Sequence, residues 1–72
     1  MVEEKIVINF LKSLEDSNLI RPNAYKEKLV VDSVRNLVSM TEEEHDEFQK
    51  NTPNKSVLTI FTEYQDWKET NL

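Results

Sequence analysis

The residue with the widest chemical repertoire in this chain is His45, the only histidine, which follows a run of acidic residues. Glu42 lies three residues before it, and Glu-x-x-His is the spacing with which di-iron helical bundles hold metal. Such a site needs a second motif of this kind and further inward carboxylates, whereas the chain carries one motif. Thr41 and Glu44 have the spacing of a capping box, which is typical of a helix start. We therefore expect this segment to be a solvated first helical turn, with no bound metal and no cofactor.

Nucleophilic catalysis has little support in the sequence. The chain contains no cysteine, and none of its serines lies in a nucleophile-elbow motif. A histidine-activated triad would have to recruit His45 from an exposed helix start. Without any glycine, phosphate-binding loops and dinucleotide turns lack the residue that shapes them. We expect the protein not to be an enzyme.

A cluster of carboxylates is the strongest charge feature. The segment 41–51 has a net charge of −4 within a chain of net charge −5. Such a block could present an acidic patch to a basic protein partner, or it could simply be a solvated helix face. The residues of this expected partner-binding patch are Glu42, Glu43, Glu44, Asp46 and Glu47.

A smaller basic island precedes the acidic cluster and suggests an alternative function. It would let the protein bind nucleic acid as a small helical transcriptional regulator, through Arg21, Lys26, Lys28 and Arg35. Phosphate contacts dominate the affinity of such proteins, and the overall charge of −5 opposes them. Nucleic-acid binding is therefore the second hypothesis, behind protein binding.

Several apolar residues fall outside the expected core stripes or near a chain end. They form a possible apolar interface made of Ile8, Tyr25, Leu29, Leu58 and Trp67. For Ile8 the simpler interpretation is a scattered surface residue. Trp67 also fits a core position, although tryptophan is enriched at interface hot spots.

The elements that must position these residues are all helices. Apolar residues such as Ile6, Phe10 and Leu14 recur at helical spacing and predict a helix over about 2–17, with Asn18 in a left-handed cap. A second helix is expected from Pro22–Asn23 to about Ser39. Its core face would comprise Val30, Val31, Val34, Leu37 and Val38, with Tyr25 and Leu29 aligned on another side.

The third predicted helix starts at the Thr41 capping box and ends near Lys50–Asn51, with Phe48 as its single aromatic anchor. The fourth starts at Thr52 or Ser56, and Thr52-Pro53 would suit an N-cap followed by the first helical position. Its heavy side chains recur at helical spacing and should pack across the first two helices. They are Val57, Ile60, Phe61, Tyr64 and Trp67.

Together these features predict an all-α fold, a compact three- or four-helix bundle with a short third helix, in a single domain over residues 1–72. A domain of 72 residues has marginal stability, and without disulfides self-association is the natural supplement. We therefore expect a homodimer.

The sequence shows neither a secretory leader nor a stretch able to span a bilayer, so we expect a cytoplasmic location without membrane contact. The function that fits best is a small non-catalytic protein–protein interaction or regulatory module.

Overall fold

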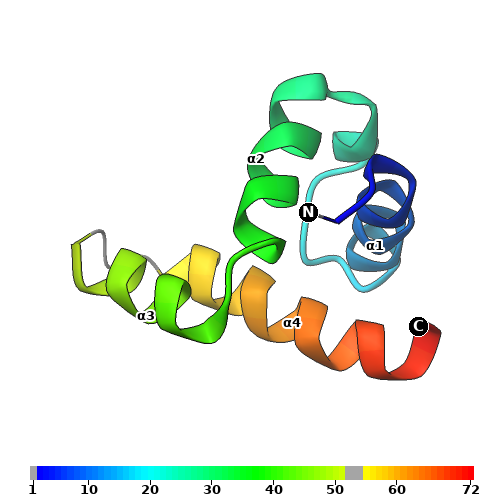
Figure 1. The fold of residues 1–72 in the computed structure, drawn as a ribbon. Coiled ribbons are helices and arrows are strands. Elements are labelled where there is room, and N and C mark those ends of the chain that lie inside the picture. The colour runs from blue at the N-terminus through cyan, green and yellow to red at the C-terminus, as the bar shows by residue number, and fades with distance from the viewer. Residues whose placement is uncertain (1, 52–54) are drawn as a thin grey trace.

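The computed structural model describes residues 2–51 and 55–72, and these form an all-α fold. Within these residues, four α-helices and one 3-10 turn follow one another (Figure 1). They are α1 (Glu4–Asp16), the 3-10 turn η1 (Ala24–Lys26), α2 (Lys28–Val38), α3 (Glu42–Asn51) and α4 (Lys55–Asn71). The expected all-α bundle with a short third helix is thus confirmed. Among the described residues, no helix combines the length and the hydropathy that a bilayer span requires.

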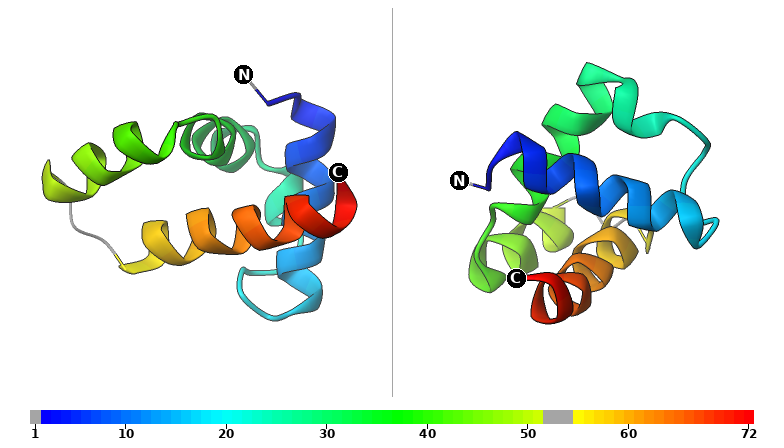
Figure 2. Two further views of the ribbon diagram at one scale, coloured as in Figure 1. Left: turned by 60° about the horizontal axis from the view of Figure 1, so that its bottom comes forward. Right: turned by 90° about the vertical axis from the view of Figure 1, so that its right-hand side faces the viewer.

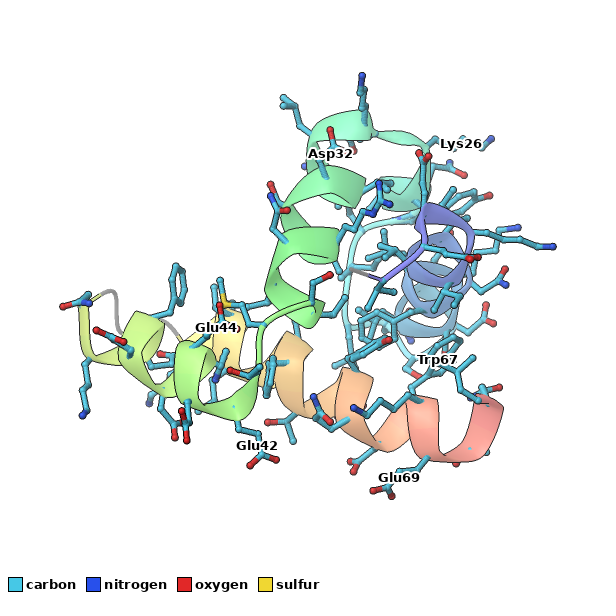
Figure 3. All side chains as sticks on the ribbon, in the orientation of Figure 1. Lys26, Asp32, Glu42, Glu44, Trp67 and Glu69 are labelled. Carbon is cyan, nitrogen blue, oxygen red and sulfur yellow. The ribbon has the colours of Figure 1, made fainter. Side chains whose placement is uncertain are left out.

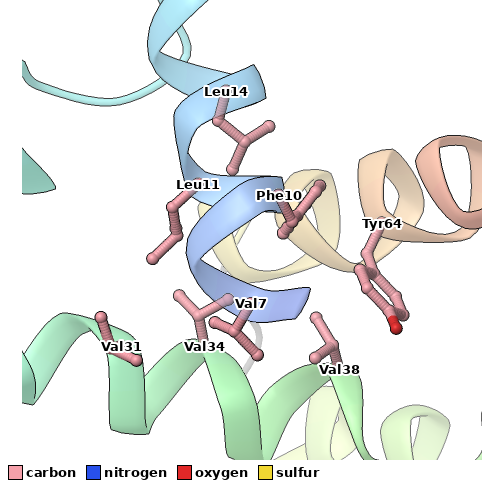
Figure 4. Packing of buried hydrophobic residues seen from close by; sticks show 8 residues of the cluster. All are labelled: Val7, Phe10, Leu11, Leu14, Val31, Val34, Val38 and Tyr64. Atoms are coloured by element: carbon pink, nitrogen blue, oxygen red, sulfur yellow. The ribbon is translucent and has the colours of Figure 1, made fainter. Parts of the chain in front are cut away.

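The core lies where α1 crosses α2 and the C-terminal half of α4 (Figures 1 and 2). The Phe10 ring of α1 meets the Tyr64 ring edge-on, with the ring centroids 5.1 Å apart, and the Trp67 ring lies 5.6 Å away. Three valines of α2 close the other side of this cluster (Figure 4). The radius of gyration is 11.6 Å, close to the roughly 11 Å expected for a folded chain of this length. The buried members of the cluster are Val7, Phe10, Leu11, Leu14, Val31, Val34, Val38 and Tyr64.

Asn18 ends α1 in the way that the sequence predicts. Its φ angle of 59° lies in the left-handed region, and its N–H donates to the carbonyl of Glu15 at 3.0 Å. The N–H of Leu19 donates to the carbonyl of Leu14 at 2.9 Å. These two bonds form a Schellman motif, which satisfies carbonyls at the helix end and turns the chain away.

The prediction of one continuous helix from Pro22 to Ser39 is wrong at its start. Asn23 has a φ angle of 64° and Glu27 is extended, so a single 3-10 turn precedes α2 and is separated from it. Tertiary packing explains the break, because this turn places Ala24 in the core at 3% exposure. Tyr25 therefore does not share a helical face with Leu29. It lies instead in the 3-10 turn, half-buried against the core, with the Lys12 Nζ atom 5.2 Å from its ring centroid.

The capping box at the start of α3 is confirmed by two reciprocal hydrogen bonds. The N–H of Thr41 donates to Glu44 Oε1, and the N–H of Glu44 donates to Thr41 Oγ1, both at 3.2 Å. The described part of this helix extends to Asn51. The predicted N-cap at Thr52-Pro53 lies outside the described residues, and the described part of the fourth helix begins at Lys55.

Candidate protein-binding surface

An apolar groove of about 280 Å³ opens between α2, α3 and α4. Two small polar residues of α2, Ser33 and Asn36, form part of its rim. The other lining side chains are apolar and come from all three helices and the turn after α2. They are Val34, Leu37, Met40, Phe48, Val57 and Ile60. A cavity of roughly 150 Å³ accepts a benzene molecule, so this groove has room for at least one large side chain.

Local structure around the α2–α3 connection places Met40 and Phe48 on the same groove. The Met40 N–H donates to the Leu37 carbonyl at 3.3 Å and closes the last turn after α2. Thr41 then caps α3 at once, so the two helices are joined by a short connection. Both groove side chains remain half-buried. Methionine adapts its shape to a ligand, and an incompletely covered aromatic ring has apolar surface left to bury.

The acidic patch lies on α3, next to the groove. All five of its carboxylate residues are exposed, and Glu44 lies one turn before Phe48 on the same side of the helix. Glu42 lies at the start of α3 and lines a shallow depression that α3 shares with α4 (Figure 3). On the outer side of α3, Glu43, Asp46 and Glu47 line a separate polar depression of about 400 Å³. The exposed side of this short helix therefore carries the negative charge.

The expectation that His45 lies on a solvated turn is wrong. Its side chain is only 2% exposed, and its ring stacks on Phe61 of α4 with centroids 3.8 Å apart and an interplanar angle of 10°. Its Nε2 atom is buried and has no hydrogen-bond partner among the described residues. His45 is the one buried residue of α3, so it anchors this helix, a role that the sequence assigned to Phe48. Histidine has no strong preference for core or surface, and contact with Phe61 of α4 makes this position a core position.

The predicted basic residues are partly engaged within the chain. Arg21 forms an ion pair with Glu27 across the 3-10 turn. Arg35 Nε donates to the carbonyl of Val2 at 2.7 Å, while the Val2 N–H donates to Ser39 Oγ at 3.0 Å. Arg35 thus ties the N-terminal segment to the end of α2.

The remaining two are exposed, with Lys26 at the end of η1 and Lys28 at the start of α2. In Figure 3, Lys26 lies far from the acidic α3.

The residues of the possible apolar interface are spread over α1, η1, α2 and α4. Leu29 is 83% exposed and Leu58 is 48% exposed, whereas Ile8, Tyr25 and Trp67 are half-buried and pack against the core. Sequence reasoning missed Met40 and Phe48 as surface-lining groups. An aromatic residue on an otherwise polar helix was the available signal, because such a helix has no core stripe for it to join.

Titration and metal binding add little to this surface. Burial raises the pKa of the Tyr64 hydroxyl above its ordinary value of 10.0. Within residues 2–51 and 55–72, no group of three or more histidine, aspartate or glutamate side chains is placed to hold a metal ion. The chemistry of the candidate surface is therefore that of an apolar groove beside a block of carboxylates.

Comparison of the chain with protein-family models, with curated proteins and with solved structures gives no match.

Proposed function

We propose that this protein is a non-catalytic binding module whose groove between α2, α3 and α4 receives an apolar anchor from a basic amphipathic helix of a partner protein. The observation that carries the proposal is the groove itself, which leaves Met40 and Phe48 half-buried at its edge. Grooves of this kind bind helical segments through a few large side chains. Covering the two residues with a partner side chain would remove their remaining apolar surface from water.

The charge around the groove specifies the polar face of the partner. Segment 41–51, whose Phe48 lines the groove, carries a net charge of −4. A segment with lysine or arginine beside its apolar anchors would be steered toward this side of the molecule. Because the carboxylates are exposed, their contribution should weaken as salt is added.

The alternative of nucleic-acid binding has less support. Arg35 is bonded to the carbonyl of Val2, and Arg21 is paired with Glu27 although its side chain is exposed. Lys26 and Lys28 are exposed as well. A few exposed cations on a chain of net charge −5 provide little of the phosphate attraction on which such binding depends. The non-catalytic character of the proposal accords with the burial of His45, the only imidazole of the chain.

A synthetic amphipathic peptide tests the proposal directly. The probe is a fluorescent helix with leucine on one face and lysine on the other, and its control carries glutamate in place of every lysine. We expect the lysine peptide to bind and the glutamate peptide not to bind. We also expect Phe48→Ala to weaken binding about tenfold or more, as the loss of a central anchor contact does. Leu58→Ala, which removes an exposed leucine outside the groove, is the matched control and should leave the affinity unchanged.

The acidic contribution has its own variant pair. Glu43→Lys/Glu47→Lys reverses two exposed charges of α3 that take no part in the capping box. It should reduce the affinity and flatten its dependence on salt, whereas Glu63→Lys/Glu69→Lys on α4 should do so far less. Equal binding of both peptides, or binding that survives Phe48→Ala unchanged, would overturn the proposal.

A further inference from the structure

The largest apolar side chain left open on α2 is Leu29, in its first turn. It is 83% exposed and stands beside the exposed Lys28. An apolar anchor next to basic residues is the chemistry that the groove of the proposed function would accept. The chain therefore carries both halves of such a contact, at opposite ends of α2.

These two halves lie along one face of the helix. Leu29, Ser33 and Asn36 follow one another at spacings of four and three residues, which places them in one row on the side away from the core. Ser33 and Asn36 are exposed, and they also form the rim of the groove. The row thus runs from the open leucine directly into the groove, with only small polar side chains between.

We infer that two copies of this chain associate through α2, packed antiparallel about a two-fold axis near Ser33, with Leu29 of each copy inserted in the groove of the other. The inference rests on the groove of the proposed function and names a second copy as its occupant, which would have to be displaced by any other partner.

The register of this pairing follows from the residue numbers. Ser33 lies midway between Leu29 and Leu37, and Leu37 lines the groove. Antiparallel helices centred on Ser33 therefore place Leu29 of one copy opposite Leu37 of the other, about 6 Å from the axis at 1.5 Å per residue. The small side chain of Ser33 permits helix axes about 8–10 Å apart. The two-fold axis makes the two contacts between Leu29 and the opposite groove identical. Each copy then uses its leucine and its groove on the same partner, so the assembly closes as a dimer.

Charge favours the same orientation. Antiparallel packing brings Lys26 of η1 and Lys28 of α2 toward the end of the other copy's α2, where the acidic α3 begins. Parallel packing would instead place like-charged ends together. The contact surface of one 11-residue helix and one groove is small. The affinity between two copies should therefore be weak, and the fraction of dimer should depend on protein concentration.

Sedimentation equilibrium of the full chain measures this association. Between about 10 μM and 1 mM, a range suited to weak contacts, we expect the wild type to pass reversibly from monomer to dimer. Leu29→Glu should weaken dimerisation about tenfold or more, as should Phe48→Ala, because they remove the two sides of the central contact. Leu72→Glu is the matched control, since Leu72 is 70% exposed at the other end of the chain. It should dimerise like the wild type.

A single introduced thiol tests the axis. The chain has no cysteine, so oxidation of Ser33→Cys should give a covalent dimer with intact helical content. A disulfide requires Cα atoms within about 7 Å, which the proposed axis provides for residue 33. Thr62→Cys, at an exposed position on α4, should remain uncrosslinked under the same conditions.

The outcomes separate this inference from the proposed function. A wild type that stays monomeric at about 1 mM, or a Leu29→Glu variant that dimerises as well as the wild type, overturns the inference whatever the peptide does. Dimerisation that is lost in Leu29→Glu supports it even if the lysine peptide fails to bind, in which case the proposed function alone is wrong. If the proposed function and the dimer are both correct, Leu29→Glu should bind the lysine peptide at least as tightly as the wild type. In this variant no second copy competes for the groove.

Discussion

His45 combines a core position with an unsatisfied polar atom. Its ring stacks on Phe61 and is almost completely buried, yet Nε2 has no partner among the described residues. A buried polar atom that lacks a hydrogen bond costs about 1–3 kcal/mol. The anchor of α3 is therefore less stable than an apolar ring at this position would be.

Substitution of His45 tests how much the unsatisfied Nε2 atom lowers the free energy of unfolding. We expect His45→Phe to raise the free energy of unfolding by about 1 kcal/mol, because the aromatic stack is kept and the unsatisfied nitrogen is removed. His45→Ala should lower it by about 2 kcal/mol through the loss of the anchor. Urea unfolding followed by circular dichroism measures both. A phenylalanine variant less stable than the wild type would contradict the assignment of Nε2 as unsatisfied.

Tyr64 makes stability depend on alkaline pH. Its pKa is raised in the folded state because burial disfavours the phenolate. As pH rises past the unfolded value of about 10, the unfolded chain loses a proton that the folded chain keeps. The contribution of Tyr64 to the free energy of unfolding is thus fully present below about pH 10 and is lost as the pH rises through the higher pKa of the folded state.

The matching measurement is urea unfolding at pH 8 and pH 11. The wild type should lose more stability between these values than Tyr64→Phe, which has no hydroxyl to ionise. Tyr25→Phe retains Tyr64 and should keep the wild-type decline. An equal decline in the wild type and Tyr64→Phe would refute the assignment.

Among the elements, α3 has the weakest attachment to the rest of the fold. It spans 10 residues with one buried side chain, while isolated helices of this length are marginal in water. Its formation therefore depends on the capping box and on His45. The groove shares this dependence, because Phe48 of α3 forms one of its walls.

Removing the cap should loosen α3 locally. We expect Thr41→Ala to cost about 1 kcal/mol, and the amides of α3 to exchange roughly fivefold faster with deuterium. The amides of α1 should be much less affected, since their protection depends on the main core. Thr62→Ala, an exposed threonine within α4, is the control and should leave α3 exchange unchanged. Uniform acceleration throughout the chain would show instead that α3 unfolds only with the whole domain.

For the whole molecule, small size and the proposed self-association are linked. A 72-residue chain without disulfides has little stability to spare. A dimer contact that forms only between folded copies stabilises them by mass action. The thermal midpoint of the wild type should therefore rise with protein concentration, and that of Leu29→Glu should rise less, as differential scanning calorimetry at two concentrations would show.

Interactions between residues close in sequence specify several of the helical features. The apolar spacing of α1, its left-handed exit at Asn18 and the reciprocal cap of Thr41 and Glu44 depend on neighbouring residues, so they were predictable. Exposed charge on α3 was predictable for the same reason.

Contacts between side chains of different helices could not be predicted in this way, because they depend on how the helices pack. The break at Glu27 arises because Ala24 is drawn into the core, and His45 is buried because Phe61 covers it. The groove joins Leu37, Phe48 and Ile60 from three helices. Periodicity specifies the direction of a side chain around its own helix, whereas the neighbour that it finds depends on how the helices cross.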